Sequence, residues 1–275
     1  MSNHGTTPEA PAELNTNVPH PARVYDYWLG GKDHFPADRR AGDAVLAANP
    51  AVRPTIKANR AFLRRVVQFL AEQAGITQFL DIGTGIPTSP NVHEVAQAVA
   101  PASRVVYVDN DPIVFAHAQA LLRSHGAGTT TVIQADLREP DKILQHPRVQ
   151  QVLDFSQPIG ILLVAVLHHL TDEEDPAGVV ARFRDSVVAG SHVAISHGTA
   201  DINPEAAAKA GQRFAEAGPA APYVARSRAE IERFFDGLTL LDPGVVQPPR
   251  WRPDGPVAVG DLDRISFYAG VGRKP

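Results

Sequence analysis

Two short hydrophobic runs, each followed by residues suited to ligand binding, constrain the fold of this chain more than any other feature. Residues 79–82 lead into Gly83-Thr84-Gly85, and residues 105–108 lead into Asp109. Both runs have the composition of buried strands. Two glycines let a backbone turn approach a ligand closely, and an acid at the next strand tip can accept hydrogen bonds from a ribose. The pair predicts a nucleoside-bearing cofactor at the carboxyl edge of a parallel sheet.

Further strands and helices alternate after these two runs, and this predicts an α/β fold with a doubly wound, mostly parallel sheet. Helices are expected at about 91–99, 112–125, 174–189 and 227–235. Asn91 with Glu94, and Ser227 with Glu230, have the spacing of capping boxes. The expected strands lie at about 77–82, 104–109, 130–134, 159–166, 190–196, 238–241 and 265–271.

Composition narrows the function classes. The chain has 275 residues, 44% of them hydrophobic, a net charge of −4 and no cysteine. Cysteine chemistry is therefore excluded, and nothing drives the chain toward nucleic acid or an anionic membrane. Arg60, Arg64 and Arg65 are interpreted as a solvated helix face. No apolar run reaches the length of about 18 residues that a membrane span needs, and the N-terminus lacks an apolar signal core. We expect a cytoplasmic protein.

The chain divides into three parts. Residues 1–20 are polar with four prolines and are expected to be a disordered tail. Residues 21–55 are expected to form an N-terminal helical cap, broken at Gly30-Gly31 and at prolines. Residues 56–275 are expected to be the catalytic domain, starting with a helix to about residue 74. Within it, an insertion at 199–222 and a Pro-rich loop at 243–256 are expected to shape a substrate pocket.

Three acids follow three successive strands: Asp81, Asp109 and Asp136. Because parallel strand tips meet at one sheet edge, these acids should gather there; the alternative is three unrelated strand-capping acids. A dinucleotide would need a third glycine and a helix N-terminus for its pyrophosphate. Asp81 would repel that pyrophosphate, whereas it suits a sulfonium and an amino group. The pattern favours S-adenosylmethionine over a nicotinamide cofactor.

The segments 22–33 (ARVYDYWLGGKD) and 84–88 (TGIPT) resemble the actinobacterial S-adenosyl methyltransferase family, long catalogued as a domain of unknown function. The resemblance covers nearly the whole chain after residue 20. It implies a class I, Rossmann-like methyltransferase fold with seven strands and an antiparallel last strand, and S-adenosylmethionine as cofactor. It implies no acceptor substrate. His34 departs from the family pattern, in which asparagine is expected.

The resemblance also implies roles for residues at the first two strand tips. Asp81, Gly83 and Gly85, with Thr84 between the glycines, would line the methionine and ribose part of the cofactor. Asp109 would take the ribose hydroxyls.

At the later tips, the resemblance places Asn110 beside the adenine. Asp136 would accept a hydrogen bond from the adenine amino group, and Leu137 would pack on the ring. The stretch from Ala165 to His168, at the end of the fourth strand, would pass under the sulfonium.

The N-terminal segment 22–33 contains aromatic side chains that end in polar groups, such as Tyr25 and Tyr27. One interpretation is a solvated amphipathic helix that buries Trp28. The other is a lid, in which Arg23 or Lys32 neutralises the methionine carboxylate and a tyrosine hydroxyl such as that of Tyr25 holds it.

His168 and His169 follow the fourth strand. Adjacent side chains on an extended strand end point in opposite directions, so a metal site is not expected. One histidine can serve as a general base, because its ordinary pKa lies near neutrality. The alternative is that one packs and the other bonds to backbone. His197 is a weaker candidate of the same kind.

The leading hypothesis is an S-adenosylmethionine-dependent methyltransferase acting on oxygen, nitrogen or carbon of a small molecule. A cofactor-binding regulatory or partner protein without transfer activity is the alternative, because no decisive acceptor motif follows the fourth strand. A nicotinamide oxidoreductase is third. The sequence does not indicate the oligomeric state.

Overall fold

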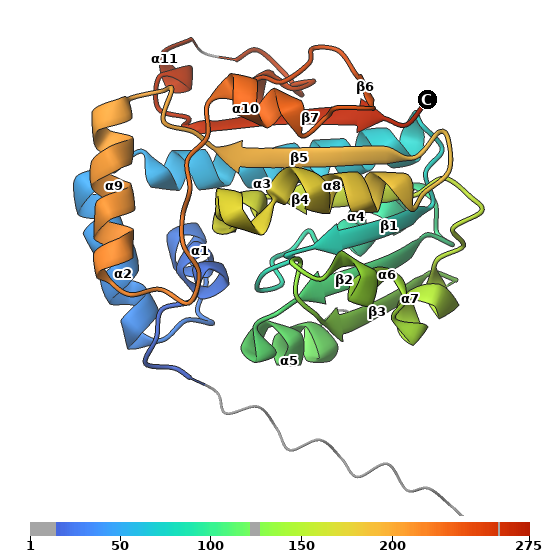
Figure 1. The fold of residues 1–275 in the computed structure, drawn as a ribbon, viewed down its shortest axis with the longest axis horizontal. Coiled ribbons are helices and arrows are strands. Elements are labelled where there is room, and N and C mark those ends of the chain that lie inside the picture. The colour runs from blue at the N-terminus through green and yellow to red at the C-terminus, as the bar shows by residue number, and fades with distance from the viewer. Residues whose placement is uncertain (1–14, 122–126, 258) are drawn as a thin grey trace, which may run out of the picture.

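The computed structural model describes residues 15–121, 127–257 and 259–275. These residues form a seven-stranded sheet in the order β3-β2-β1-β4-β5-β7-β6 (Figure 1). The strands are β1 (Gln78–Ile82), β2 (Arg104–Asp109), β3 (Thr129–Gln134), β4 (Gly160–Val164), β5 (His192–Gly198), β6 (Thr239–Leu240) and β7 (Phe267–Arg273).

Strands β1 to β5 pair in parallel, whereas β7 runs antiparallel to both β5 and β6. The predicted fold class, a mostly parallel seven-stranded sheet with an antiparallel last strand, is confirmed. In β1 the register places Asp81 beside Tyr107 of β2 and Leu162 of β4. The acid that follows the first hydrophobic run therefore lies in the middle of the sheet.

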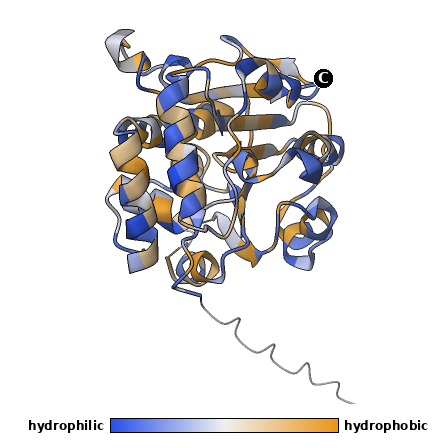
Figure 2. Cartoon of the chain, turned by 60° about the vertical axis from the view of Figure 1, so that its left-hand side comes forward, coloured by the Kyte–Doolittle hydropathy of each residue, from blue (hydrophilic) through white to orange (hydrophobic). Residues whose placement is uncertain are grey.

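Helices cover both faces of the sheet. One hydrophobic cluster joins the strands to α3 (Val52–Glu72), α4 (Val92–Val99) and α5 (Pro112–Leu121). The other joins them to α6 (Pro140–Leu144), α7 (Pro147–Val152), α8 (Pro176–Asp185) and α10 (Arg228–Arg233). In Figure 2 the strands are largely hydrophobic and the surrounding helices mix both kinds of residue. This is the pattern of a three-layer α/β domain.

Three helices gather where β1 to β5 end, on the left of the sheet in Figure 1. They are α1 (Pro21–Leu29), α2 (Pro36–Ala48) and α9 (Pro204–Glu216). A small cluster of Val24, Val45, Phe214 and neighbouring side chains holds them together. The predicted N-terminal cap thus lies over the carboxyl edge of the sheet, together with the insertion that follows β5.

Several predicted boundaries shift for local reasons. The helix expected from Ile56 begins at Val52, because Pro54 falls in the first turn, where a missing N–H group is tolerated. The fourth strand ends at Val164, because Ala165 adopts a left-handed backbone with φ of 58°. The helix expected to reach residue 125 is described only to Leu121, and the rest of that prediction lies outside the described residues.

The expected tail and the Pro-rich loop also differ from prediction. Residues 1–14 lie outside the described part, but Pro19 is buried and Val18 faces a cavity. The loop 243–256 lies against α3: Arg65 donates to the carbonyl oxygens of Trp251 (3.1 Å) and Pro248 (2.6 Å). Arg65 is therefore buried rather than solvated, and the prediction of a solvated face is wrong for it.

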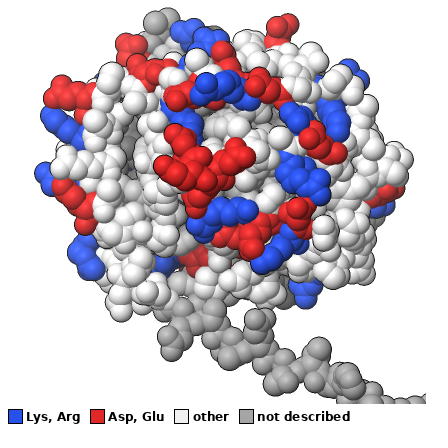
Figure 3. Space-filling view, in the orientation of Figure 1, with Lys and Arg blue, Asp and Glu red and all other residues white. Residues whose placement is uncertain are grey.

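The remaining short elements are the 3₁₀ turns η1 (Leu167–His169), η2 (Asp172–Glu174) and η3 (Pro248–Arg250), with α11 (Val259–Leu262). Acidic and basic side chains are interspersed over the face shown in Figure 3. No helix among the described residues is long and apolar enough to cross a membrane.

Candidate cofactor site

A cavity of about 360 Å³ opens at the carboxyl edge of the sheet, beneath α1. Its volume lies within the range of small-molecule sites. Every residue predicted to bind the cofactor lines it: Arg23, Tyr25, Asp81, Gly83, Thr84, Gly85, Asp109, Asn110, Asp136, Leu137 and Ala165. The three acids at successive strand tips therefore share one cavity.

The glycine turn after β1 is shaped by β2. The N–H groups of Gly83 and Thr84 both donate to the carbonyl oxygen of Val108, at 2.8 and 3.1 Å. Gly83 has φ of 71°, and a Cβ atom there would come within 2.4 Å of the Val166 side chain. Only glycine fits this position, which explains why the turn can pass close to the end of β4.

Asp109 holds the turn from the second strand tip. Its Oδ2 accepts the N–H of Gly85 at 2.8 Å, and its Oδ1 accepts the N–H of Asp111 at 3.0 Å. Each carboxylate oxygen can accept more than one hydrogen bond, so the group can still accept from ligand hydroxyls. Asp109 was predicted from the sequence to bind the ligand, but its second role, holding the glycine turn, was not predicted.

Two of the acids are costly to keep charged in the protein. Burial raises the pKa of Asp81 to about 7, only partly offset by a hydrogen bond from Thr84. Burial also raises the pKa of Asp109 to about 6, against the hydrogen bonds from backbone N–H groups. A cation or a set of hydroxyl donors in the cavity would favour the ionised forms.

Asp136, in contrast, is stabilised in its ionised form. Arg138 binds it through two nitrogens, at 2.8 and 2.6 Å, and the Asn110 amide donates to it at 3.2 Å. These contacts, the Arg138 hydrogen bond foremost, lower the pKa of Asp136 to about 2. Arg138 also forms an ion pair with Glu174. No role for Arg138 was predicted from the sequence, although it follows Asp136 by only two residues.

A buried chain of hydrogen bonds ties the cap to the sheet edge. The N–H of Ala165 donates to Oγ of Ser196 at 3.0 Å, and that hydroxyl donates to Asn59 at 2.6 Å. The Asn59 amide then donates to the hydroxyl of Tyr25 at 2.9 Å. Tyr25 lines the cofactor cavity, and Asn59 of α3 holds its hydroxyl group in place. The sequence pattern did not indicate a role for Asn59 or Ser196.

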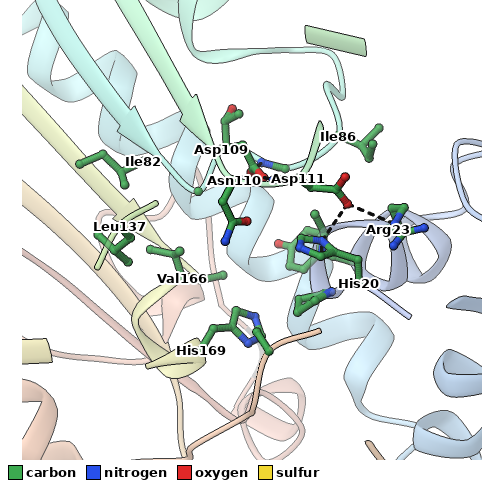
Figure 4. Close-up of a pocket in the computed structure, with 18 of the residues that line it drawn as sticks. His20, Arg23, Ile82, Ile86, Asp109, Asn110, Asp111, Leu137, Val166 and His169 are labelled. Carbon is green, nitrogen blue, oxygen red and sulfur yellow. Dashed lines mark hydrogen bonds and ion pairs between the residues drawn. The ribbon is translucent and has the colours of Figure 1, made fainter. Parts of the chain in front are cut away.

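Ionic contacts join the N-terminal segment to the end of β2, as Figure 4 shows. Asp111 lies 3.2 Å from Arg23 and 3.1 Å from His20. Arg23 is also 3.6 Å from Asp38, and its Nη2 donates to the carbonyl oxygen of Val18. These groups close the wall of the cavity between α1 and α5.

The predicted role of the cations in this segment needs correction. Arg23 is buried between two carboxylates, so its charge is already compensated inside the protein. Lys32 is exposed and does not line the cavity. His34 lies 3.1 Å from Asp26. Arg23 forms part of the wall, but it is not a free positive charge awaiting a ligand carboxylate.

The two adjacent histidines occupy a 3₁₀ turn, not an extended strand end, and their ring centroids are 4.5 Å apart. His169 lines the cofactor cavity, where burial lowers its pKa to about 4. His168 does not line it; it faces a second, smaller cavity among α1, α3 and α9. His197 is buried; its Nδ1 donates to the carbonyl oxygen of Gly198 and its Nε2 accepts from Arg226. Among the described residues, no group of three or more histidine or acidic side chains is placed to hold a metal ion.

The donor set of the large cavity fits an adenosyl sulfonium. Asp81 and Asp109 are buried carboxylates without a cationic partner within ion-pairing distance in the described residues. Leu137 and Ile82 supply apolar wall near Asn110 (Figure 4). Such a site suits a ribose, an ammonium or sulfonium charge and a flat base better than a pyrophosphate.

The fold and this site define a class I, Rossmann-like S-adenosylmethionine-dependent methyltransferase. Residues 7–275 match the profile of the S-adenosyl methyltransferase family, and the chain belongs to that family. S-adenosylmethionine is the cofactor of the family, which sets aside the nicotinamide alternative.

Two solved structures are similar along nearly their whole length. One is a DUF574 family protein from Streptomyces avermitilis, 46% identical, with 96% of this chain and 100% of that chain covered and a TM-score of 0.92. The other, solved as a candidate methyltransferase from Thermobifida fusca, is 41% identical, with 98% and 99% covered and a TM-score of 0.87. No curated protein matches the chain.

Proposed function

We propose that this methyltransferase binds S-adenosylmethionine in the cavity at the carboxyl edge and transfers its methyl group to a small molecule. The observation that carries the proposal is the convergence of Asp81, Asp109 and Asp136 on one cavity beside the Gly83–Gly85 turn. When bound, the cofactor supplies a methyl group on a positively charged sulfur, which keeps the bonding electron pair when the methyl leaves.

In this proposal the first two strand tips hold the polar parts of the cofactor. Asp109, already fixed by the N–H groups of Gly85 and Asp111, accepts the ribose hydroxyls. Asp81, fixed by Thr84 at 3.0 Å, faces the positively charged end of the ligand. Both carboxylates are then ionised, because positive charge and hydroxyl donors offset their burial.

The adenine would lie at the lip formed by Asn110, Asp136 and Leu137, all of which line the cavity. Because Arg138 occupies both oxygens of Asp136, we assign this acid to shaping the lip and to accepting at most one further hydrogen bond. Leu137 offers the apolar surface on which a base can pack.

The cap would act as the lid of the site. Tyr25 and Arg23 on α1 line the cavity together with the glycine turn, and the Asp111 contacts hold α1 in place. A lid excludes water and aligns the acceptor, and alignment of this kind can lower a reaction barrier by roughly 7–11 kcal/mol.

A small acceptor is supported by the closed surroundings of the methyl-bearing end. Tyr25 and His169 line both the cofactor cavity and the second cavity, which measures about 90 Å³. The predicted contribution of the loop 243–256 is wrong, because neither cavity has a lining residue from it. The insertion 199–222 would shape the pocket through α9 residues such as Ala210 and Phe214, which line the second cavity.

Calorimetric titration with S-adenosylhomocysteine, followed by incubation with methyl-labelled cofactor and a metabolite extract, tests the proposal. We expect saturable binding and at least one labelled small product. Binding without any labelled product would favour the alternative of a regulatory cofactor-binding protein. A wild-type protein that binds no S-adenosylhomocysteine would refute the proposed site.

A further inference from the structure

The second cavity is walled by apolar side chains and touches the cofactor cavity. Pro21, Tyr25 and His169 line both cavities, which therefore lie next to each other. Val24, Phe214 and Phe267 are among the apolar walls of the smaller one. No aspartate, glutamate, lysine or arginine lines it. A charged ligand would lose its hydration there without gaining a countercharge.

Three polar groups at this cavity have unused hydrogen-bonding capacity. The ring of His169 donates from Nδ1 to the carbonyl oxygen of Pro222 at 2.7 Å, so its Nε2 carries the lone pair. The ring of His168 accepts the N–H of Gly198 on Nδ1 at 3.3 Å, so its Nε2 carries the proton. Neither Nε2 atom, nor the hydroxyl of Tyr223, has a hydrogen-bond partner among the residues that the structure describes.

These groups present an acceptor, a donor and a hydroxyl to an uncharged space that is also lined by Asn49, Thr55, Thr199 and Ser266. A neutral hydroxyl matches them, because it donates one hydrogen bond and accepts others. A carboxylate cannot donate to Nε2 of His169, and an ammonium cannot accept from His168. A hydrocarbon would leave all three groups unpaired, which is costly in a buried site.

We propose that the second cavity binds the methyl acceptor, and that the acceptor is a small uncharged molecule with a hydroxyl group that donates to Nε2 of His169. The inference rests on the proposed function and specifies its substrate class. Burial keeps His169 neutral, since its pKa lies at about 4, so the lone pair is available at neutral pH.

The proton balance assigns His169 a further task. A hydroxyl oxygen that forms a bond to a methyl carbon must lose its proton. Nε2 of His169 takes that proton, and the ring then returns it to solvent when the cavity opens. His168, which does not line the cofactor cavity, acts as a positioning residue through its Nε2–H group.

The size of the cavity limits the acceptor. At about 90 Å³ it is smaller than the 150 Å³ cavity known to admit benzene, so a single ring enters only when the walls part slightly. The wall formed by α9 packs on α1 and α2 rather than on the sheet core, which allows such a shift.

Binding of phenol, benzene and benzoate to the protein, with and without saturating S-adenosylhomocysteine, tests the inference without relying on turnover. Calorimetry or NMR titration is expected to give phenol at least tenfold tighter binding than benzene and benzoate. Ala210→Leu, which fills the cavity from α9, is expected to reduce phenol affinity at least tenfold and leave S-adenosylhomocysteine affinity within twofold. Lys209→Leu, on the exposed side of the same helix, is the matched control and is expected to change neither affinity.

His169→Phe is expected to bring phenol and benzene affinities within twofold of each other. Phe214→Trp fills the same space and serves if Ala210→Leu does not fold. The inference is overturned if benzoate binds as tightly as phenol, or if a folded filling variant binds phenol as well as the wild type does. Loss of S-adenosylhomocysteine binding in the wild type would instead overturn the proposed function, because phenol is also titrated without it.

Discussion

Asp81→Asn is expected to stabilise the ligand-free protein at alkaline pH while it weakens cofactor binding. Asp81 lies in the middle of the sheet, only 5% exposed, and its pKa is raised from 3.8 to about 7 by burial. A rise of about three pKa units corresponds to about 4 kcal/mol of ionisation cost in the folded state. Asparagine removes that cost and can still accept from Thr84.

The direction of the pH dependence follows from the raised pKa. The folded protein holds the Asp81 proton more tightly than the unfolded chain does. This contribution to stability is therefore complete below about pH 4 and is lost as the pH rises through about 7. The wild type should lose up to about 4 kcal/mol over that interval through Asp81, in addition to a smaller loss through Asp109.

Urea unfolding at pH 5 and pH 8 measures the effect. Asp81→Asn should be more stable than the wild type by about 1.5 kcal/mol at pH 5 and by up to about 4 kcal/mol at pH 8. Asp263→Asn, at an exposed acid, is the control and should follow the wild type. An Asp81→Asn protein that is less stable than the wild type at pH 8 would refute the assignment of burial as the dominant influence on this acid.

Three further substitutions test separate parts of the site. Asp109→Ala should weaken S-adenosylhomocysteine binding roughly 10- to 100-fold by calorimetry, because it removes charge-assisted hydrogen bonds of about 1.5–3 kcal/mol; unchanged affinity would exclude the ribose role. Arg23→Met should lower the free energy of unfolding by about 3–5 kcal/mol in urea, since it strands two buried carboxylates, and a protein of wild-type stability would contradict the structural role of that network. Gly83→Ala should lower stability by about 1–3 kcal/mol and weaken the cofactor, with Val166→Ala restoring part of both; equal losses with and without the second change would count against the close approach at 2.4 Å.

The parts of the fold that follow from local sequence were predictable. Strand β1 ends just before Gly83 and strand β2 ends at Asp109, as predicted. The caps at Asn91 and Ser227 begin α4 and α10 as expected. These features depend on neighbouring residues. The convergence of Asp81, Asp109 and Asp136 was also predictable, because parallel strands bring their tips to one edge.

The parts that depend on long-range partners were not predictable. Arg23 resembled a free cation in the sequence, and only folding shows that Asp38 and Asp111 enclose it. Arg65 resembled a surface residue until the distant loop around Trp251 covered it. The difference between His168 and His169 arises from a 3₁₀ turn: both residues line the smaller cavity, and only His169 also lines the cofactor cavity.

A crystal structure with S-adenosylhomocysteine tests the central claim most directly. The account predicts that both ribose hydroxyls lie within hydrogen-bond distance of Asp109, with the adenine at Leu137 and the sulfur facing His169 and Ala165. An adenosyl group bound elsewhere, or a ribose without contact to Asp109, would contradict it.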